Sequence, residues 1–225
     1  MLFFPVDVAI AWTAIVHFVN NIFKVILVGV HADGEVMLKF GIPAILFAFG
    51  GAWVMLMIPD QYNIYSYTWD GHIYEVSVLK FIIALLLLGF ALIEFVPRFR
   101  KISFSEKLMP LGGALSGFFG GLSGNQGALR TAFLIKSDLS KEAFIGTTVL
   151  ISTLVDLSRL GVYSSRFADI VVSEGIGIVW YASGAAAAGA LLGSRLLKKV
   201  TMPLIQTLVA VALILLSVAM MAGLV

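Results

Sequence analysis

Residues 108–135 read LMPLGGALSGFFGGLSGNQGALRTAFLI, and this stretch decides how the chain folds. It is apolar and rich in glycine, and a polar cluster, SGNQG at 123–127, interrupts it. A spanning helix needs about 20 residues to cross a bilayer core about 30 Å thick. As helices, the half before the cluster would rise about 23 Å and the half after it about 15 Å, so neither half spans well by itself. The stretch is therefore a broken span or a re-entrant hairpin, because irregular backbone at that depth must be buried in protein or line a wet cavity.

The rest of the chain has the composition of a membrane protein. Of its 225 residues, 60% are apolar and only 12% are charged, and the mean hydropathy is +1.02. A soluble domain carries about 25% charged residues. The chain has no cysteine, which excludes disulfides, cysteine metal sites and thiol nucleophiles. Its net charge of +2 does not indicate nucleic-acid binding, because the basic residues lie in short loops between apolar runs.

Six other segments are long and apolar enough to span a bilayer. They are 7–29, 37–58, 76–96, 142–163, 174–197 and 203–225. Because most loops are short, we predict one membrane domain, 1–225, with an all-α, polytopic helical bundle. The loop 59–75 is the exception, and its four Tyr and one Trp are typical of a loop at the lipid–water interface.

Loop charges favour the re-entrant hairpin over a full crossing. Basic residues are concentrated in the loops 97–107 and 195–201, and such loops are usually cytoplasmic. Both loops face the cytoplasm only if 108–135 enters and leaves the membrane on that side. We therefore predict a hairpin there, with Arg166 in an outer loop.

The chain contains an internal repeat. The segments 7–29 and 142–163 overlay with an offset of 135 positions, and their polar residues at i, i+4, i+8 and i+11 then share one helical face. We assign 1–97 to the first repeat and 108–225 to the second, in opposite orientations, as in many secondary transporters. The matched pairs are Asp7 and Glu142, Thr13 and Thr148, His17 and Ser152, Asn21 and Asp156, and Lys24 and Arg159.

The first repeat has no counterpart of the glycine-rich element. About 35 residues separate that element from Glu142, whereas only six residues precede Asp7. The alternatives are a start codon assigned too far downstream or a protein that works with one hairpin, and we favour the first.

Several stretches resemble the TauE/SafE sulfite-exporter family of bacterial membrane transporters. The most specific is LGGALSGFFGGLSGNQGALRTAFL at 111–134, supported by FIGTTVLISTLVDLSRL at 144–160, TAIVHFVNNIFK at 13–24 and FGIPAILFAFGGAW at 40–53. The resemblance implies a multi-pass protein of the bacterial inner membrane that transports sulfite, a sulfonate or a related organosulfur acid. It implies no enzyme activity and no cofactor.

The polar cluster is the first candidate binding site for such an anion. The start of a half-helix offers unpaired N–H groups and the positive end of the helix dipole. Gly124, Asn125, Gln126 and Gly127 would open the second half-helix, and Arg130 one turn later can hold two oxygens with its planar fork. The alternative is that the two amides only cap backbone groups and that Arg130 snorkels to the interface. Packing of helices explains the glycine run 112–121.

The two matched polar faces supply the other candidates. They contribute His17 and Asn21 from the first repeat, and Asp156 and Arg159 from the second. Asp156 and Arg159 lie at i, i+3 and are expected to pair with each other. Lys24 and Arg159 alternatively anchor to headgroups. His17 either takes up a coupling proton or makes an interhelical hydrogen bond. Asp7 and Glu142 are expected to cap their helices.

Two other function classes remain open at this point. A channel or a non-transporting partner subunit is the alternative to a transporter, because channels also use broken helices. An intramembrane enzyme is disfavoured because no arrangement of Ser, His and Asp makes a triad recognisable. The partners expected are the anion, the lipid bilayer and protons as coupling ion, and the chain is compatible with a homo-oligomer.

Overall fold

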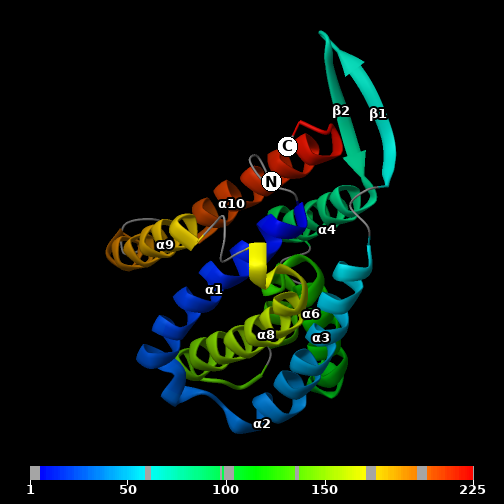
Figure 1. Cartoon of the computed structure of the whole chain (residues 1–225). Helices are drawn as coiled ribbons and strands as arrows, with labels where there is room; N and C mark the ends of the chain where they lie inside the picture. The colour runs from blue at the N-terminus through cyan, green and yellow to red at the C-terminus, as the bar shows by residue number, and fades with distance from the viewer. Residues whose placement is uncertain are drawn as a thin grey trace.

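The computed structural model describes residues 6–58, 62–96, 98, 104–134, 137–170, 176–196 and 202–224, most of them helical. Figure 1 shows the helices gathered in one bundle, with a strand pair projecting from one end. The long helices are α1 (Val6–Val28), α3 (Ile42–Met57), α4 (Val78–Phe95), α6 (Met109–Ser123), α7 (Gly127–Leu134), α8 (Lys141–Ile170), α9 (Ile176–Leu196) and α10 (Met202–Met221). Short turns occur at η1 (Gly29–His31), α2 (Gly34–Val36), η2 (Met37–Gly41, a π-helical turn) and η3 (Glu106–Leu108).

Local signals set where several helices begin. The Ser77 hydroxyl caps α4 by accepting the N–H of Lys80 at 3.2 Å, and the Ser140 hydroxyl accepts the N–H of Ala143 at the start of α8. Glu142 lies in the first turn of α8, where the helix dipole favours a carboxylate. The side chain of Asp7, its proposed counterpart in the repeat, lies outside the described side chains.

Three helical segments among the described residues are long and apolar enough to cross a membrane. They are Val8–Ile26, Gly34–Met57 and Lys141–Ser165, and Val78–Ile93 and Thr207–Met221 are shorter apolar helices. One predicted boundary is wrong. Helix α8 continues to Ile170, so Arg166 belongs to this helix and not to a loop.

Some basic residues used to predict the topology lie outside the described part of the chain. Residues 1–5 also lie outside the described part of the chain. They bear on the prediction that the first repeat lacks a glycine-rich element. The basic residues concerned are Arg100, Lys101, Lys136, Lys198 and Lys199, together with the side chains of Arg166 and Arg195.

Helices α3 and α6 run parallel in close backbone contact. A Cβ added at Gly113, Gly117 or Gly121 would lie 2.2, 2.0 or 2.2 Å from the carbonyl oxygens of Phe40, Ala44 and Ala48 respectively. The glycines recur every fourth residue and form one stripe, which fits against the Ala44–Ala48 stripe of α3. The glycine run therefore packs two helices at a separation that no larger residue allows.

Helix α7 folds back along α6. Gly124 ends α6 in the left-handed conformation with φ of 80°. At the far end of the pair, a Cβ at Gly112 would lie 2.3 Å from the ring of Phe133, which also stacks on Phe104 at 4.2 Å. The Ser116 hydroxyl donates to the Gln126 carbonyl at 3.4 Å. The beginning of α6 thus meets the end of α7, as in a hairpin.

Two further helix pairs are antiparallel. In the pair α1–α8, Asn21 bonds to Asp156, and a Cβ at Gly146 would lie 2.5 Å from the Val28 carbonyl oxygen. In the pair α4–α10, the start of α4 lies beside the end of α10. There Leu79 and Met220 belong to one buried cluster.

Residues 63–77 form a β-hairpin and not a loop, so the expectation of an all-α chain is wrong here, while the position at the lipid–water interface stays a prediction. Strands β1 (Asn63–Trp69) and β2 (His72–Ser77) pair antiparallel. They turn at Asp70-Gly71, both at positive φ, which is the turn chemistry of a two-residue hairpin loop. Figure 1 shows the hairpin extending beyond α4 and α10. The hydroxyls of Tyr65 and Tyr67 donate to the carbonyls of Met221 and Ala222 at the end of α10.

The α3–α6 contact predicts a sharp difference between glycines. Replacing Gly117 with Ala forces the Cβ against the Ala44 carbonyl and should destabilise the protein by about 1–3 kcal/mol. Gly89 in α4 has no atom within 4 Å of an added Cβ. Gly89→Ala is therefore the control, and should be neutral or stabilising by up to about 1 kcal/mol. Thermal unfolding of both variants in detergent measures the difference, and equal melting temperatures would contradict the assigned contact.

Candidate functional site

A cavity of about 530 Å³ lies where α1, α4, α8 and α10 meet the break after α6. Both polar and aliphatic side chains line it. The polar lining residues are Thr13, His17, Ser123, Gly124, Asn125 and Arg159, and the apolar ones are Ala9, Ile10, Ile83, Leu87, Leu213 and Leu216.

The strongest polar group in the cavity is the guanidinium of Arg159. Its residue is only 1% exposed, although it carries a full positive charge. Nη2 lies 2.8 Å from Oδ1 of Asp156, the residue one turn earlier on α8. Oδ2 of Asp156 accepts a hydrogen bond from Nδ2 of Asn21 at 2.8 Å. The expected Asp156–Arg159 pair is thus present, and the headgroup-anchor interpretation of Arg159 is wrong because the side chain is buried.

Two of the three guanidinium nitrogens of Arg159 have no hydrogen-bond partner in the described part of the chain. Among the described residues, Nε and Nη1 of Arg159 are buried and make no hydrogen bond. Nη1 lies 2.5 Å from the position that a Cβ on Gly124 would take. Because Gly124 also has φ of 80°, both its conformation and the guanidinium beside it require glycine. Unused N–H donors therefore meet the break at the cavity.

A tyrosine fixes α8 against this break. The Tyr163 hydroxyl donates to the Gly121 carbonyl at 2.6 Å, two residues before α6 ends. Tyr163 lies four residues after Arg159 on the same helical face, and that spacing was the signal by which the sequence could have indicated it. The sequence analysis also did not identify the aliphatic lining residues of α4 and α10, because nothing distinguishes them from other leucines and isoleucines in a spanning helix. They are Ile83, Leu87, Leu213 and Leu216.

The predicted site residues divide into three groups in the structure. His17, Gly124, Asn125 and Arg159 line the cavity, and Asn21 and Asp156 stand behind Arg159. A third group, Gln126, Gly127 and Arg130, lies outside the lining.

Arg130 and Gln126 contact protein instead of the cavity. Nη1 of Arg130 donates to the Ser152 hydroxyl on α8 at 2.6 Å, so this side chain does not snorkel to an interface. Gln126 is buried against Gly120, and its Oε1 has no partner among the described residues. The cavity thus meets the end of α6 and Asn125 rather than the first turn of α7.

The geometry suits an anion more than it suits catalysis. The Arg159 guanidinium and the Asn125 amide both line the cavity. His17 makes no hydrogen bond to a serine anywhere in the described ranges. Within the same ranges no group of three His, Asp or Glu residues is arranged to hold a metal ion.

The family model described as sulfite exporter TauE/SafE matches residues 1–220 of the chain. The chain belongs to the TauE/SafE family. Membership implies a membrane protein that transports sulfur anions. No curated protein and no solved structure matches this TauE/SafE chain. The buried arginine beside the glycine break is therefore interpreted from its own geometry.

The buried ion pair of this TauE/SafE protein predicts strong coupling between its two members. Asp156→Leu leaves the Arg159 charge buried and unpaired, and should destabilise the fold by about 3–5 kcal/mol. Adding Arg159→Met removes the stranded charge, so the double variant should regain most of that loss. Denaturation of the single and double variants in detergent measures the coupling. Losses that simply add would show that the two side chains do not depend on each other.

Proposed function

We propose that this protein is a secondary transporter that carries a small sulfur-containing anion across the bacterial inner membrane. The anion is sulfite, a sulfonate or a related organosulfur acid, and it binds at Arg159 beside Gly124 and Asn125. The observation that carries the proposal is the half-satisfied guanidinium of Arg159 at a cavity. A buried donor without a partner is unfavourable, and an oxyanion supplies acceptors in the geometry that arginine prefers.

The neighbouring carboxylate moderates how tightly an anion is held. Asp156 neutralises most of the Arg159 charge, and Asn21 keeps the carboxylate in place. The anion is then bound largely by hydrogen bonds from Arg159 and from the Asn125 amide in the same lining. Transport requires binding that is favourable enough for entry and weak enough for release. A fully unpaired buried arginine would favour retention of the anion.

The contact between α1 and α8 supports an inverted repeat around this site. Asn21 and Asp156 are equivalent positions in the overlay of the two repeats, and they are hydrogen-bonded to each other. Two equivalent residues meet in this way when a twofold axis passes between them, with the helices antiparallel. The antiparallel pair α4–α10 is consistent with the same axis. Inverted-repeat transporters bind substrate near such an axis, at discontinuous helices.

Transport measurements test the anion site directly. Arg159→Met should lower sulfite or methanesulfonate flux into proteoliposomes at least tenfold, because the donors at the cavity are lost. Lys39→Met is the control for loss of charge, because it removes an exposed cation that lies outside the cavity lining. This variant should transport normally.

Two further measurements complete that experiment: the flux through Arg130→Ala, and the accumulation of the anion against its concentration gradient. Flux lost in Arg130→Ala but kept in Arg159→Met would place the anion at the α7 arginine instead. Accumulation against a gradient identifies a transporter, whereas flux only down the gradient identifies a channel.

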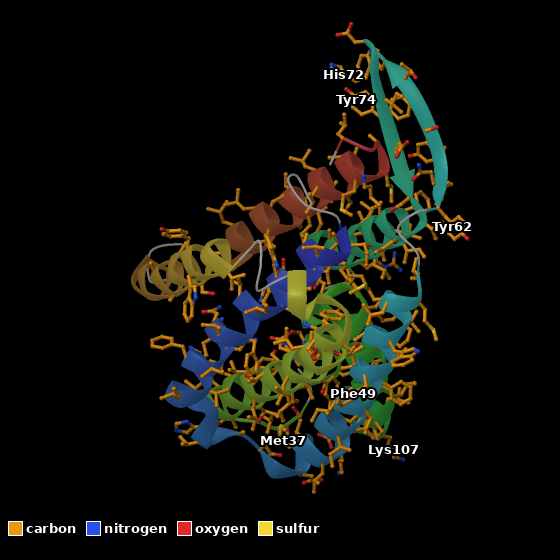
Figure 2. All side chains as sticks on the ribbon, in the orientation of Figure 1. Met37, Phe49, Tyr62, His72, Tyr74 and Lys107 are labelled. Carbon is orange, nitrogen blue, oxygen red and sulfur yellow. The ribbon has the colours of Figure 1, made fainter. Side chains whose placement is uncertain are left out.

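The proposed topology gives a separate prediction. Figure 2 shows Lys107 at the opposite end of the molecule from His72 and Tyr74 of the β-hairpin. If the loop of Lys107 faces the cytoplasm, the β-hairpin faces outward. The chain has no cysteine, so Thr68→Cys and Ser105→Cys each introduce a single label site. An impermeant maleimide should label Thr68→Cys in right-side-out vesicles, and Ser105→Cys only after permeabilisation. Labelling of both from one side would contradict this orientation.

A further inference from the structure

The cavity has a wall that a bare oxyanion does not use. Its lining includes Ile83 and Leu87 from α4 and Leu213 and Leu216 from α10. Ile83 and Leu87 belong to the buried core, with Leu213 and Leu216 packed against it. The wall is therefore a built part of the fold and continues the core to the edge of the polar site.

The size of the cavity points the same way. A water molecule takes up about 30 Å³, and an ion such as sulfite has the volume of roughly two waters. The cavity encloses about 530 Å³, within the range typical of sites for organic ligands. A bare sulfite would leave most of this volume, and the whole aliphatic wall, without a partner.

The charge at the polar wall favours a single negative charge. Asp156 already uses one edge of the Arg159 guanidinium, so the pair contributes little net positive charge. The other polar lining residues are Thr13, His17, Ser123 and Asn125. The hydroxyls of Thr13 and Ser123 already donate to the carbonyls of Ala9 and Phe119, so Asn125 is the lining residue that adds an uncharged donor group. A sulfonate carries one negative charge and three acceptor oxygens on one end of a carbon skeleton, which matches the unpartnered nitrogens of Arg159 beside the amide of Asn125.

We propose that the substrate is an amphiphilic organosulfonate, with its sulfonate at Arg159 and Gly124 and an apolar carbon chain along α4 and α10. This inference rests on the proposed anion site and adds the second half of the substrate. Burial of each further methylene should tighten binding about fourfold until the chain fills the cavity.

A series of linear alkanesulfonates from one to eight carbons tests the proposal. The protein is held in nanodiscs of phosphatidylcholine, and affinity is measured by calorimetry. Affinity should rise with chain length and then level off. Leu213→Trp fills the apolar wall and should weaken hexanesulfonate binding at least tenfold, and by much more than it weakens methanesulfonate binding. Leu215→Trp is the matched control, because Leu215 is 65% exposed on the same helix and lies outside the lining.

A second variant tests the same wall independently, in case Leu213→Trp does not fold. Leu216→Ala enlarges the same wall and should move the best chain length upward. If affinity is independent of chain length but lost in Arg159→Met, the organosulfonate inference fails and the anion site stands. If no sulfonate and no sulfite binds, the proposed function itself fails.

A comparison of two lipid compositions separates soluble substrates from lipids. It is needed because an anionic lipid and an alkanesulfonate both have an anionic head and an apolar chain. Nanodiscs containing phosphatidylglycerol should bind hexanesulfonate as those of phosphatidylcholine do. Loss of hexanesulfonate binding in phosphatidylglycerol would assign the cavity to an anionic lipid and overturn the proposal.

Discussion

The buried pair of Asp156 and Arg159 is the constraint on which the centre of this structure depends. A guanidinium that is 1% exposed is stable only if its charge is paired and its donors find acceptors. Asp156 meets part of that demand, and Asn21 holds Asp156 from α1. This requirement brings α1 and α8 together at one register. It also places the remaining donors of Arg159 against Gly124, where only glycine fits. The cavity, the break and the antiparallel helix pair thus share one electrostatic cause.

Small residues give the rest of the bundle its geometry. Gly113, Gly117 and Gly121 place α6 in backbone contact with α3, so that the break after Ser123 is carried by a rigid pair and not by a free loop. Tyr163 then bonds to the buried carbonyl of Gly121 and ties that break to the helix of the ion pair. On the other side, the hydroxyls of Tyr65 and Tyr67 hold the end of α10, the helix that carries half of the apolar wall. The polar site is therefore held from α6 and α8, and the apolar wall from the hairpin end.

Some features were visible in the sequence and others were not, for physical reasons. The Asp156–Arg159 pair was predictable because i, i+3 neighbours share a helical face. The β-hairpin at 63–77 was missed although it carries the Asp-Gly turn signal, because aromatic residues near a membrane suggest an interface first. Arg130 was expected beside the polar cluster as an anion ligand, but it donates to Ser152, since the rotation of α7 about its axis depends on how that helix packs on α6 and α8.

By itself the sequence determined that the chain is a membrane protein with a broken glycine-rich element. Length, hydropathy and spacing along one helix are local properties, and a sequence states them directly. Only the tertiary structure decided that Asn21 touches Asp156, that Nε and Nη1 of Arg159 have no partner among the described residues, and that α4 and α10 add aliphatic residues to the same cavity. Those contacts depend on how helices far apart in sequence are rotated and translated against each other. Close packing of the whole bundle sets these rotations, and no single segment encodes them.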